Sequence, residues 1–254
     1  MKIGVELAYR LLRLLKPGNS SQGDCEPSLP YASRIKRIIG ERGWDELRDK
    51  TIVDFGCGMG TGSIEMAQHG ARRVIGIDIR SSLLEIASGL AKETGVSHLC
   101  DFRESIDVKA DVIVSIDTFE HVTDPAGALR IMHGLLKDEG FVLLSFGPIW
   151  HHPCGGHFFS IFPWSHLVFP EEAQIRWRSH FKHDGATRFT EVDGGLNMMA
   201  IGRFIELIER SDFRFETLRL VPIRPLRWLH SRLTQEFTTA LVECKMVKKS
   251  RSRG

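Results

Sequence analysis

The chain has 254 residues, of which 42% are hydrophobic and 26% charged, and its formal net charge is +2. This length can bury one substantial core, so we expect one domain with an insertion. The near-neutral charge excludes a protein that binds polyanions over its whole surface, and no apolar run approaches the roughly 20 residues of a membrane span. Five widely spaced cysteines without a CxxC pair argue against a disulfide framework and favour a reducing, cytoplasmic compartment.

The N-terminal segment, residues 1–16, has apolar residues at helical spacing that Arg10 and Arg13 interrupt. No small-residue cleavage site follows, so the segment is an amphipathic helix rather than a signal peptide. One interpretation is that this helix packs on the domain or covers its functional site. The other is that it lies on a membrane surface as a peripheral helix. Residues 17–30 are rich in Gly, Ser, Asn and Pro and predict a linker.

Strand and helix patterns alternate through the middle of the chain, after a helical pattern at 31–44. The expected strands are residues 51–55, 73–78, 111–116 and 140–146, and the expected helices are residues 61–69, 81–93 and 125–136. The run at 111–116 is apolar on both faces, which is typical of a parallel strand covered by helices on both sides. The alternation predicts an α/β fold with a doubly wound sheet.

The regular pattern stops at Gly147. Residues 147–195 are rich in aromatic residues and histidine, and a segment of this length carries function or has a small fold of its own. A helix at 198–210 and two closing strands at 213–221 and 236–247 follow. The arginine-rich connection between these strands either meets an anionic substrate or surface, or is a solvated helix-turn.

Basic residues also gather near the C-terminus, at positions 245–253. We interpret them as a solvated tail, the alternative being a nucleic-acid or membrane patch, and expect no nucleic-acid partner.

Alternating glycines at positions 56, 58, 60 and 62 follow the first expected strand and open a helix. Such a loop presents free backbone N–H groups at the positive end of a helix dipole, and it lets a cofactor approach the backbone closely. The nicotinamide fingerprint G-x-G-x-x-G would need glycine at Thr61 or Ser63, so a nicotinamide dehydrogenase is excluded. Asp78 ends the next strand about 20 residues on, where a carboxylate accepts hydrogen bonds from ribose hydroxyls.

These motifs together resemble those of class I S-adenosylmethionine-dependent methyltransferases. Residues 53–60, VDFGCGMG, resemble the first motif of that family, and residues 74–79, VIGIDI, resemble the second. Residues 115–122, SIDTFEHV, followed by Asp124-Pro125, are similar to the fourth-strand motif of the ubiquinone-biosynthesis O-methyltransferase branch. The resemblance covers residues 35–146 and weakens beyond Gly147.

The resemblance implies a seven-stranded Rossmann-like sheet with an antiparallel last strand, N-terminal helices in residues 1–44, and a methyltransferase domain in residues 45–254. Residues 147–197 would form a lid inserted after strand 5. This insertion either covers the methyl group with aromatic and histidine side chains, or is a self-packed cap whose histidines bind backbone groups. S-adenosyl-L-methionine would be the cofactor. The implied cofactor-binding residues are Asp54, Gly56, Cys57, Gly58, Gly60, Asp78, Ile79, Asp101, Phe102, Ile116 and Asp117. Glu104-Ser105 is a rival to Asp101-Phe102 for the adenine contact.

The chemistry that the resemblance implies is methyl transfer to a small-molecule acceptor. An Asn/Asp-Pro-Pro-aromatic motif, typical of adenine-N6 and glutamine methylation, is absent, and oxygen is the preferred acceptor atom. A hydroxyl nucleophile would profit from a histidine base, for which His121, His157 and His166 are the candidates. The spacing of His151, His152, Cys154 and His157 is not that of a familiar zinc site, so we expect no metal. The alternative function is a cofactor-binding partner protein without catalytic activity.

Overall fold

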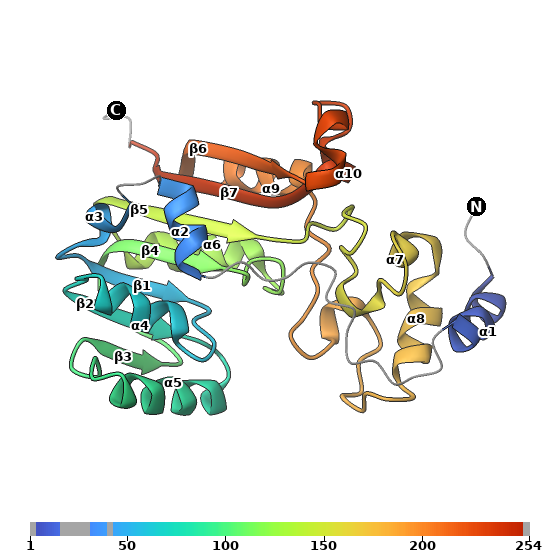
Figure 1. Cartoon of the computed structure of the whole chain (residues 1–254), viewed down its shortest axis with the longest axis horizontal. Helices are drawn as coiled ribbons and strands as arrows, with labels where there is room; N and C mark the ends of the chain where they lie inside the picture. Colours follow the sequence, from blue (N-terminus) through green and yellow to red (C-terminus); the bar gives the residue numbers. More distant parts are fainter. Residues whose placement is uncertain (1–3, 16–30, 40–42, 251–254) are drawn as a thin grey trace.

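The computed structural model describes residues 4–15, 31–39 and 43–250. Seven strands form one sheet in the order β3-β2-β1-β4-β5-β7-β6 (Figure 1). The strands are β1 (Thr51–Phe55), β2 (Arg73–Ile77), β3 (Cys100–Arg103), β4 (Ala110–Ile116), β5 (Leu136–Phe146), β6 (Phe213–Pro222) and β7 (Thr239–Lys248). Strands β1 to β5 pair in parallel, and β7 is antiparallel to both β5 and β6. The predicted doubly wound sheet with an antiparallel last strand is confirmed.

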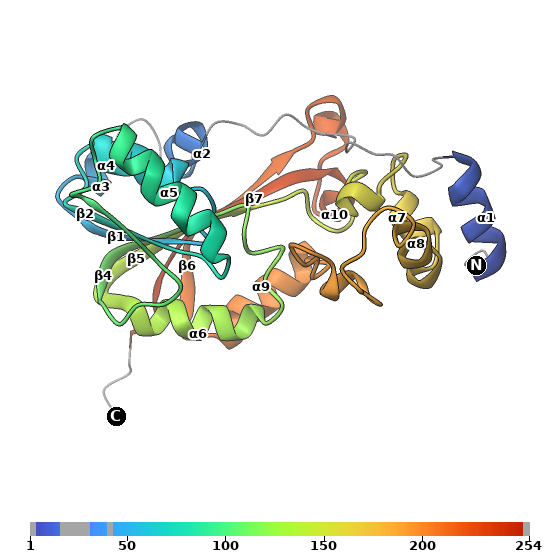
Figure 2. The ribbon, with the colours of Figure 1, turned by 90° about the horizontal axis from the view of Figure 1, so that it is seen from below.

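Helices cover both faces of the sheet (Figure 2). One face carries α2 (Tyr31–Ile39), α3 (Gly43–Leu47), α4 (Thr61–Gln68) and α5 (Ser81–Glu93), and the other carries α6 (Pro125–Leu135) and α9 (Ile201–Arg210). Adjacent residues of one strand enter opposite cores, since side chains alternate across a strand. Ile52 packs into the core beneath the first group of helices, and Val53 packs into the core beneath the second.

The order of the strands reverses between β1 and β4, because β2 and β3 lie on one side of this pair and β5 on the other. The loops after β1 and β4 therefore leave in opposite directions and create a crevice at the carboxyl ends of the strands. Ligands bind at this position in doubly wound sheets.

The insertion after β5 lies beyond this carboxyl edge, on the right in Figure 1. It contains the short helices η1 (His157–Phe159), α7 (Ser165–Val168), α8 (Glu171–Arg178) and η2 (Phe189–Glu191). Phe159, Trp177 and Phe189 form a core that Ala8 and Leu12 of α1 (Val5–Leu15) complete. Helix α1 thus packs on the insertion, which has a small core of its own.

Several boundaries differ from the sequence-based predictions. Helix α9 begins at Ile201 instead of residue 198, and β5 begins at Leu136 instead of Gly140. Lys245 and Lys248 are not part of a solvated tail, because they lie in β7 and form ion pairs with Glu46, Glu216 and Asp138. The predicted linker at 17–30 and the last residues of the predicted tail, 251–254, lie outside the described residues.

Three cysteines, Cys57, Cys100 and Cys244, are free thiols, whereas Cys154 is disulfide-bonded, a single bond that composition did not predict. Among the described residues, no helix is both long and apolar enough to cross a membrane.

Candidate functional site

The glycine loop after β1 is closed at its first glycine and open at its second. Gly56 has φ +78°, and a Cβ there would lie 2.2 Å from Cγ2 of Thr118, in the loop after β4. Gly58 has φ +53°, and a Cβ there would have no atom within 4 Å. The backbone at Gly58 therefore faces open space, and a bound group can approach it to a distance that a side chain would prevent.

The ring of Phe102, in β3, packs against Gly60 of this loop and Gly76 of β2. A Cβ at Gly60 would lie 2.7 Å from the Phe102 ring, and a Cβ at Gly76 would lie 2.6 Å from it. The neighbouring Asp101 pairs with Arg73 at 3.0 Å and with Arg103 at 2.7 Å. Asp101 is in register with the middle of β2, so its carboxylate does not reach the carboxyl edge.

The rival adenine contact, Glu104, follows the last residue of β3. It accepts a hydrogen bond of 2.6 Å from Ser81 Oγ at the start of α5. Glu104 thus lies nearer than Asp101 to the edge where β2 ends. Both assignments remain predictions, and the geometry favours Glu104.

Asp78 joins the glycine loop to the end of β2. Its buried carboxylate accepts hydrogen bonds from the backbone N–H of Gly58 and of Arg80, both at 3.0 Å, and from Arg80 Nε at 3.2 Å. Burial raises the pKa of Asp78, but the hydrogen bonds from Arg80 and Gly58 outweigh it, so the pKa lies below its ordinary value and the group stays ionised. The side chain of Ile79 beside it is 91% exposed, which leaves an apolar surface free at this edge.

Two further polar groups lie at the glycine loop. Asp54 at the end of β1 is buried and accepts a hydrogen bond of 2.6 Å from Ser63 Oγ of α4. Burial, and then the charges of Asp54 and Asp78, raise the pKa of the Cys57 thiol far above its ordinary value. Cys57 is therefore protonated at neutral pH and is not a thiolate nucleophile.

The end of β4 meets helix α2. Ile116 is buried, and Asp117, with φ +52°, forms an ion pair with the almost fully buried guanidinium of Arg34. A second ion pair, between Arg37 and Glu243 of β7 at 2.5 Å, fixes α2 over the sheet. Sequence reasoning missed Arg34, because helical periodicity marks apolar positions and gives no signal for a buried cation that pairs with a distant loop.

Both ends of the insertion are attached to residues 119–122, the motif that follows β4. At one end, Oε1 of the buried Glu120 accepts a hydrogen bond of 3.1 Å from Gly147 N. At the other end, Nδ2 of Asn197 donates to the carbonyl oxygens of Phe119 and Val122, at 2.7 and 2.8 Å. The motif therefore fixes both ends of the insertion at the carboxyl edge of the sheet.

Glu120 itself is an unusual buried acid. Its Oε2 has no hydrogen-bond partner among the described residues. Burial raises its pKa to about 7, although the backbone N–H of Gly147 and the charge of Arg34 act in the opposite direction. A carboxyl group in this position gains or loses its proton near neutral pH.

Of the three candidate histidines, the structure brings His121 and His157 together, with ring centroids 5.0 Å apart. His121 Nδ1 lies 2.9 Å from the carbonyl oxygen of Gly195. Because a carbonyl only accepts, Nδ1 carries the proton in the neutral ring, and the lone pair of Nε2 is left to accept one. Gly195 permits this contact, since a Cβ there would lie 2.5 Å from the His121 carbonyl oxygen.

His157 and His166 have different surroundings. Burial lowers the pKa of His157 to about 3, and its Nε2 has no hydrogen-bond partner among the described residues. His166 uses both ring nitrogens, with Nε2 2.6 Å from Trp150 O and Nδ1 3.0 Å from Ser160 Oγ. His166 therefore holds the insertion together and has no nitrogen left for proton transfer. No group of three or more metal-ligating side chains occurs in the described part of the chain.

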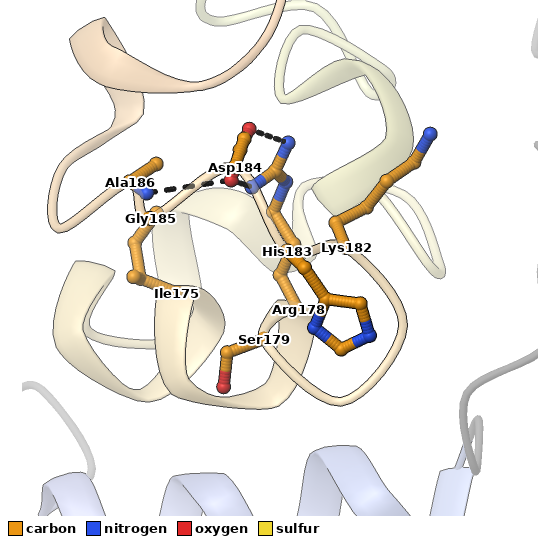
Figure 3. A pocket seen from close by; sticks show the side chains of 8 residues that line it. All are labelled: Ile175, Arg178, Ser179, Lys182, His183, Asp184, Gly185 and Ala186. Carbon is orange, nitrogen blue, oxygen red and sulfur yellow. Dashed lines mark hydrogen bonds and ion pairs between the residues drawn. The ribbon is translucent and has the colours of Figure 1, made fainter.

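A hollow of about 250 Å³ lies elsewhere, between α8 and the loop that follows it (Figure 3). Arg178 projects into it and forms an ion pair with Asp184, whose carboxylate also accepts hydrogen bonds from the backbone N–H of Ala186 and Asp193. These contacts close the loop on α8, and none of the residues named above as candidates lines the hollow. The candidate site is therefore the carboxyl edge of the sheet.

Comparison with known proteins identifies the family of the chain. A family model described as a methyltransferase domain matches residues 28–187. A ubiquinone biosynthesis O-methyltransferase from Pseudomonas paraeruginosa is 39% identical over 107 residues, which are 39% of this chain and 45% of that protein. The matched part thus spans less than half the length of such relatives.

Two solved structures share the fold at low sequence identity. One is a putative S-adenosylmethionine-dependent methyltransferase from Listeria monocytogenes, with a TM-score of 0.56 and 16% identity, which covers 87% of this chain and 98% of that one. The other, the [4+2]-cyclase SpnF, has a TM-score of 0.57 and 15% identity over 98% of each chain. The family model spans more than half of the sequence, so the chain belongs to the methyltransferase domain family, the class that uses S-adenosylmethionine as methyl donor.

Proposed function

We propose that this protein transfers a methyl group from S-adenosylmethionine to a hydroxyl oxygen of a small-molecule acceptor. The observation that carries the proposal is the open space at Gly58 beside the ionised Asp78, at the crevice of a sheet whose family uses this donor. The cofactor supplies a methyl group on a sulfonium, which is its own leaving group. The protein then has to bind and orient the cofactor and the acceptor, and to accept the proton of the acceptor hydroxyl.

The cofactor would be held by residues from three loops. The backbone at Gly58 leaves room for its methionine part, and Asp78 would accept hydrogen bonds from its ribose. The exposed side chain of Ile79 offers an apolar surface to the adenine ring. The Arg34–Asp117 pair lies at the end of β4, where the resemblance would put the methionine part. A cationic guanidinium at this point suits a carboxylate.

His121 is the residue we assign to proton transfer. Its Nδ1–H donates to Gly195, so Nε2 can accept the proton of an acceptor hydroxyl while its oxygen forms the new bond to carbon. His157 packs beside His121, and its lowered pKa keeps it neutral, so the charge of a second imidazolium does not oppose protonation of His121. Removal of the base would cost on the order of 10²–10⁴-fold in rate.

The acceptor oxygen is supported by the relatives. Relatives such as the one from Pseudomonas paraeruginosa are named O-methyltransferases, and residues 115–122 resemble the same branch. The SpnF likeness shows that one fold carries other activities, so the reaction has to be measured.

Two measurements test the function. Calorimetry should detect binding of S-adenosylmethionine and of its demethylated product, S-adenosylhomocysteine, but no binding of NAD. Transfer of a labelled methyl group to a panel of phenols and catechols should be lost in His121→Asn, while calorimetric binding of the cofactor is retained. Cofactor binding without turnover on any acceptor would favour the alternative, a silent partner protein, and NAD binding alone would refute both.

A further inference from the structure

The connection between β6 and β7 projects from the body of the protein. It comprises residues 224–238, called the tip below, with the helices η3 (Arg224–Leu229) and α10 (Gln235–Thr238) at its two ends. Figures 1 and 2 both show this segment standing out from the sheet. Its projection makes the tip accessible to a large partner.

The tip carries four exposed large apolar side chains. Trp228 is 77% exposed and Leu233 is 97% exposed. Leu229 and Phe237 are also exposed, at 41% and 47%. Exposed apolar residues are ordinary when they are scattered singly, whereas four of them within ten residues favour an interaction site. Tryptophan is the side chain most suited to a boundary between water and an apolar medium, because its ring is amphipathic.

These side chains are not a core that failed to form, because the inner side of the tip is packed. Ile223 and Leu226 pack on Ala240 and Leu241 of β7. His230 Nδ1 lies 2.9 Å from Thr238 Oγ1, and the backbone N–H of Ile223 donates to Thr238 O at 2.8 Å. The tip is therefore held in place while Trp228 faces solvent.

The charges of the tip have one sign on the outside. Arg224, Arg227 and Arg232 are exposed, and the only acidic residue in 223–238 is Glu236. The Glu236 carboxylate is turned toward α9, where it accepts hydrogen bonds from the backbone N–H of Ile201 and Gly202 at 3.1 and 2.7 Å. The exposed residues of the tip thus combine three cations with an apolar group, and none of them is acidic.

We propose that the tip docks onto an anionic lipid bilayer, with Trp228 and Leu233 entering the interface and the arginines contacting lipid headgroups. A projecting surface of this chemistry fits a deformable plane, and each arginine near an anionic surface adds attraction that salt screens. The Phe237 ring packs on His151, at the start of the insertion, with centroids 5.1 Å apart. Docking therefore brings the insertion close to the bilayer. The proposal does not depend on methyl transfer.

Vesicle co-sedimentation of the full chain tests the tip. Wild-type protein should bind vesicles of equal parts phosphatidylcholine and phosphatidylglycerol at low salt, and bind phosphatidylcholine vesicles much less. Arg227→Gln combined with Arg232→Gln should weaken binding roughly 25-fold, at about fivefold for each arginine. Trp228→Ser combined with Leu233→Ser should weaken it by at least about tenfold, through the lost apolar burial.

Two matched controls replace exposed apolar residues elsewhere, Ile131→Ser on α6 and Leu14→Ser on α1, and both should bind as the wild type does. Circular dichroism of each variant verifies that the fold is retained. Wild-type binding in the two tip variants would overturn the proposal, as would loss of binding in Leu14→Ser alone. An absence of vesicle binding, with self-association in sedimentation velocity that the tip variants abolish, would show that the tip is a protein interface instead.

Discussion

The substitution Glu120→Gln should remove a pH-dependent part of the stability. Burial raises the pKa of Glu120 from 4.5 to about 7, so the folded protein holds this proton at pH values where the unfolded chain releases it. The resulting stabilisation is fully present below pH 4.5 and is lost as pH rises through about 7. The difference between the two pKa values corresponds to about 3 kcal/mol of unfolding free energy. Glutamine has no proton to lose, and its carbonyl oxygen can still accept from Gly147 N.

Histidines of the same region act in the opposite direction. Burial lowers the pKa of His157 to about 3 and of His166 to about 4, so each destabilises the folded protein as pH falls below 6.5. These contributions are common to the wild type and to Glu120→Gln. The difference between the two proteins therefore isolates the glutamate.

Urea unfolding of both proteins at about pH 5, 6, 7 and 8 gives the free energies. The variant should gain about 2 to 3 kcal/mol relative to the wild type across this range. Glu85→Gln, at an exposed position on α5, is the control and should follow the wild type at every pH. If the unfolding free energies of Glu120→Gln and the wild type change in parallel with pH, the inference that burial raises the pKa of this carboxyl is refuted.

Three further substitutions test other parts of the site. Gly58→Ala should fold, with about 1–2 kcal/mol of backbone strain, but should bind S-adenosylmethionine at least about tenfold more weakly in calorimetry, since its methyl group enters the open space. Asp78→Ala should weaken the same binding by about 1–3 kcal/mol through lost hydrogen bonds to a charged group. The wild type should lose unfolding free energy as pH falls from about 6.5 to 5, and in His157→Asn this loss should be about 2 kcal/mol smaller, measured by urea unfolding. Asparagine suits the φ of +50° at this residue.

Each of these tests has a result that contradicts it. Gly89→Ala, in α5 with no atom near its Cβ, is the control for Gly58 and should leave binding unchanged. Equal affinities for Gly58→Ala and Gly89→Ala would mean that the cofactor does not approach Gly58. An unchanged dissociation constant in Asp78→Ala would remove the ribose from this carboxylate. If His157→Asn loses as much unfolding free energy on acidification as the wild type does, His157 is not buried as a neutral ring.

The sequence by itself determined the sheet and the glycine loop. Periodicity of the apolar residues identified the parallel strands, because a covered parallel strand is apolar on both faces and a surface helix on one. The glycine spacing and Asp78 predicted a nucleotide-type site, because the hydrogen-bonding geometry of such a loop depends on residues close together in sequence. The pattern of residues 115–122 then directed the prediction to one branch of methyltransferases.

Only the tertiary structure decided how distant residues meet. It distinguished His121, whose Nε2 is left to accept a proton, from His166, whose two nitrogens hold the insertion. It placed Arg34 beside Asp117, and it turned Glu236 inward while Trp228 faces solvent. The physical reason is that burial, pKa and hydrogen-bond saturation are set by neighbours far apart along the chain, and local sequence patterns do not encode those neighbours.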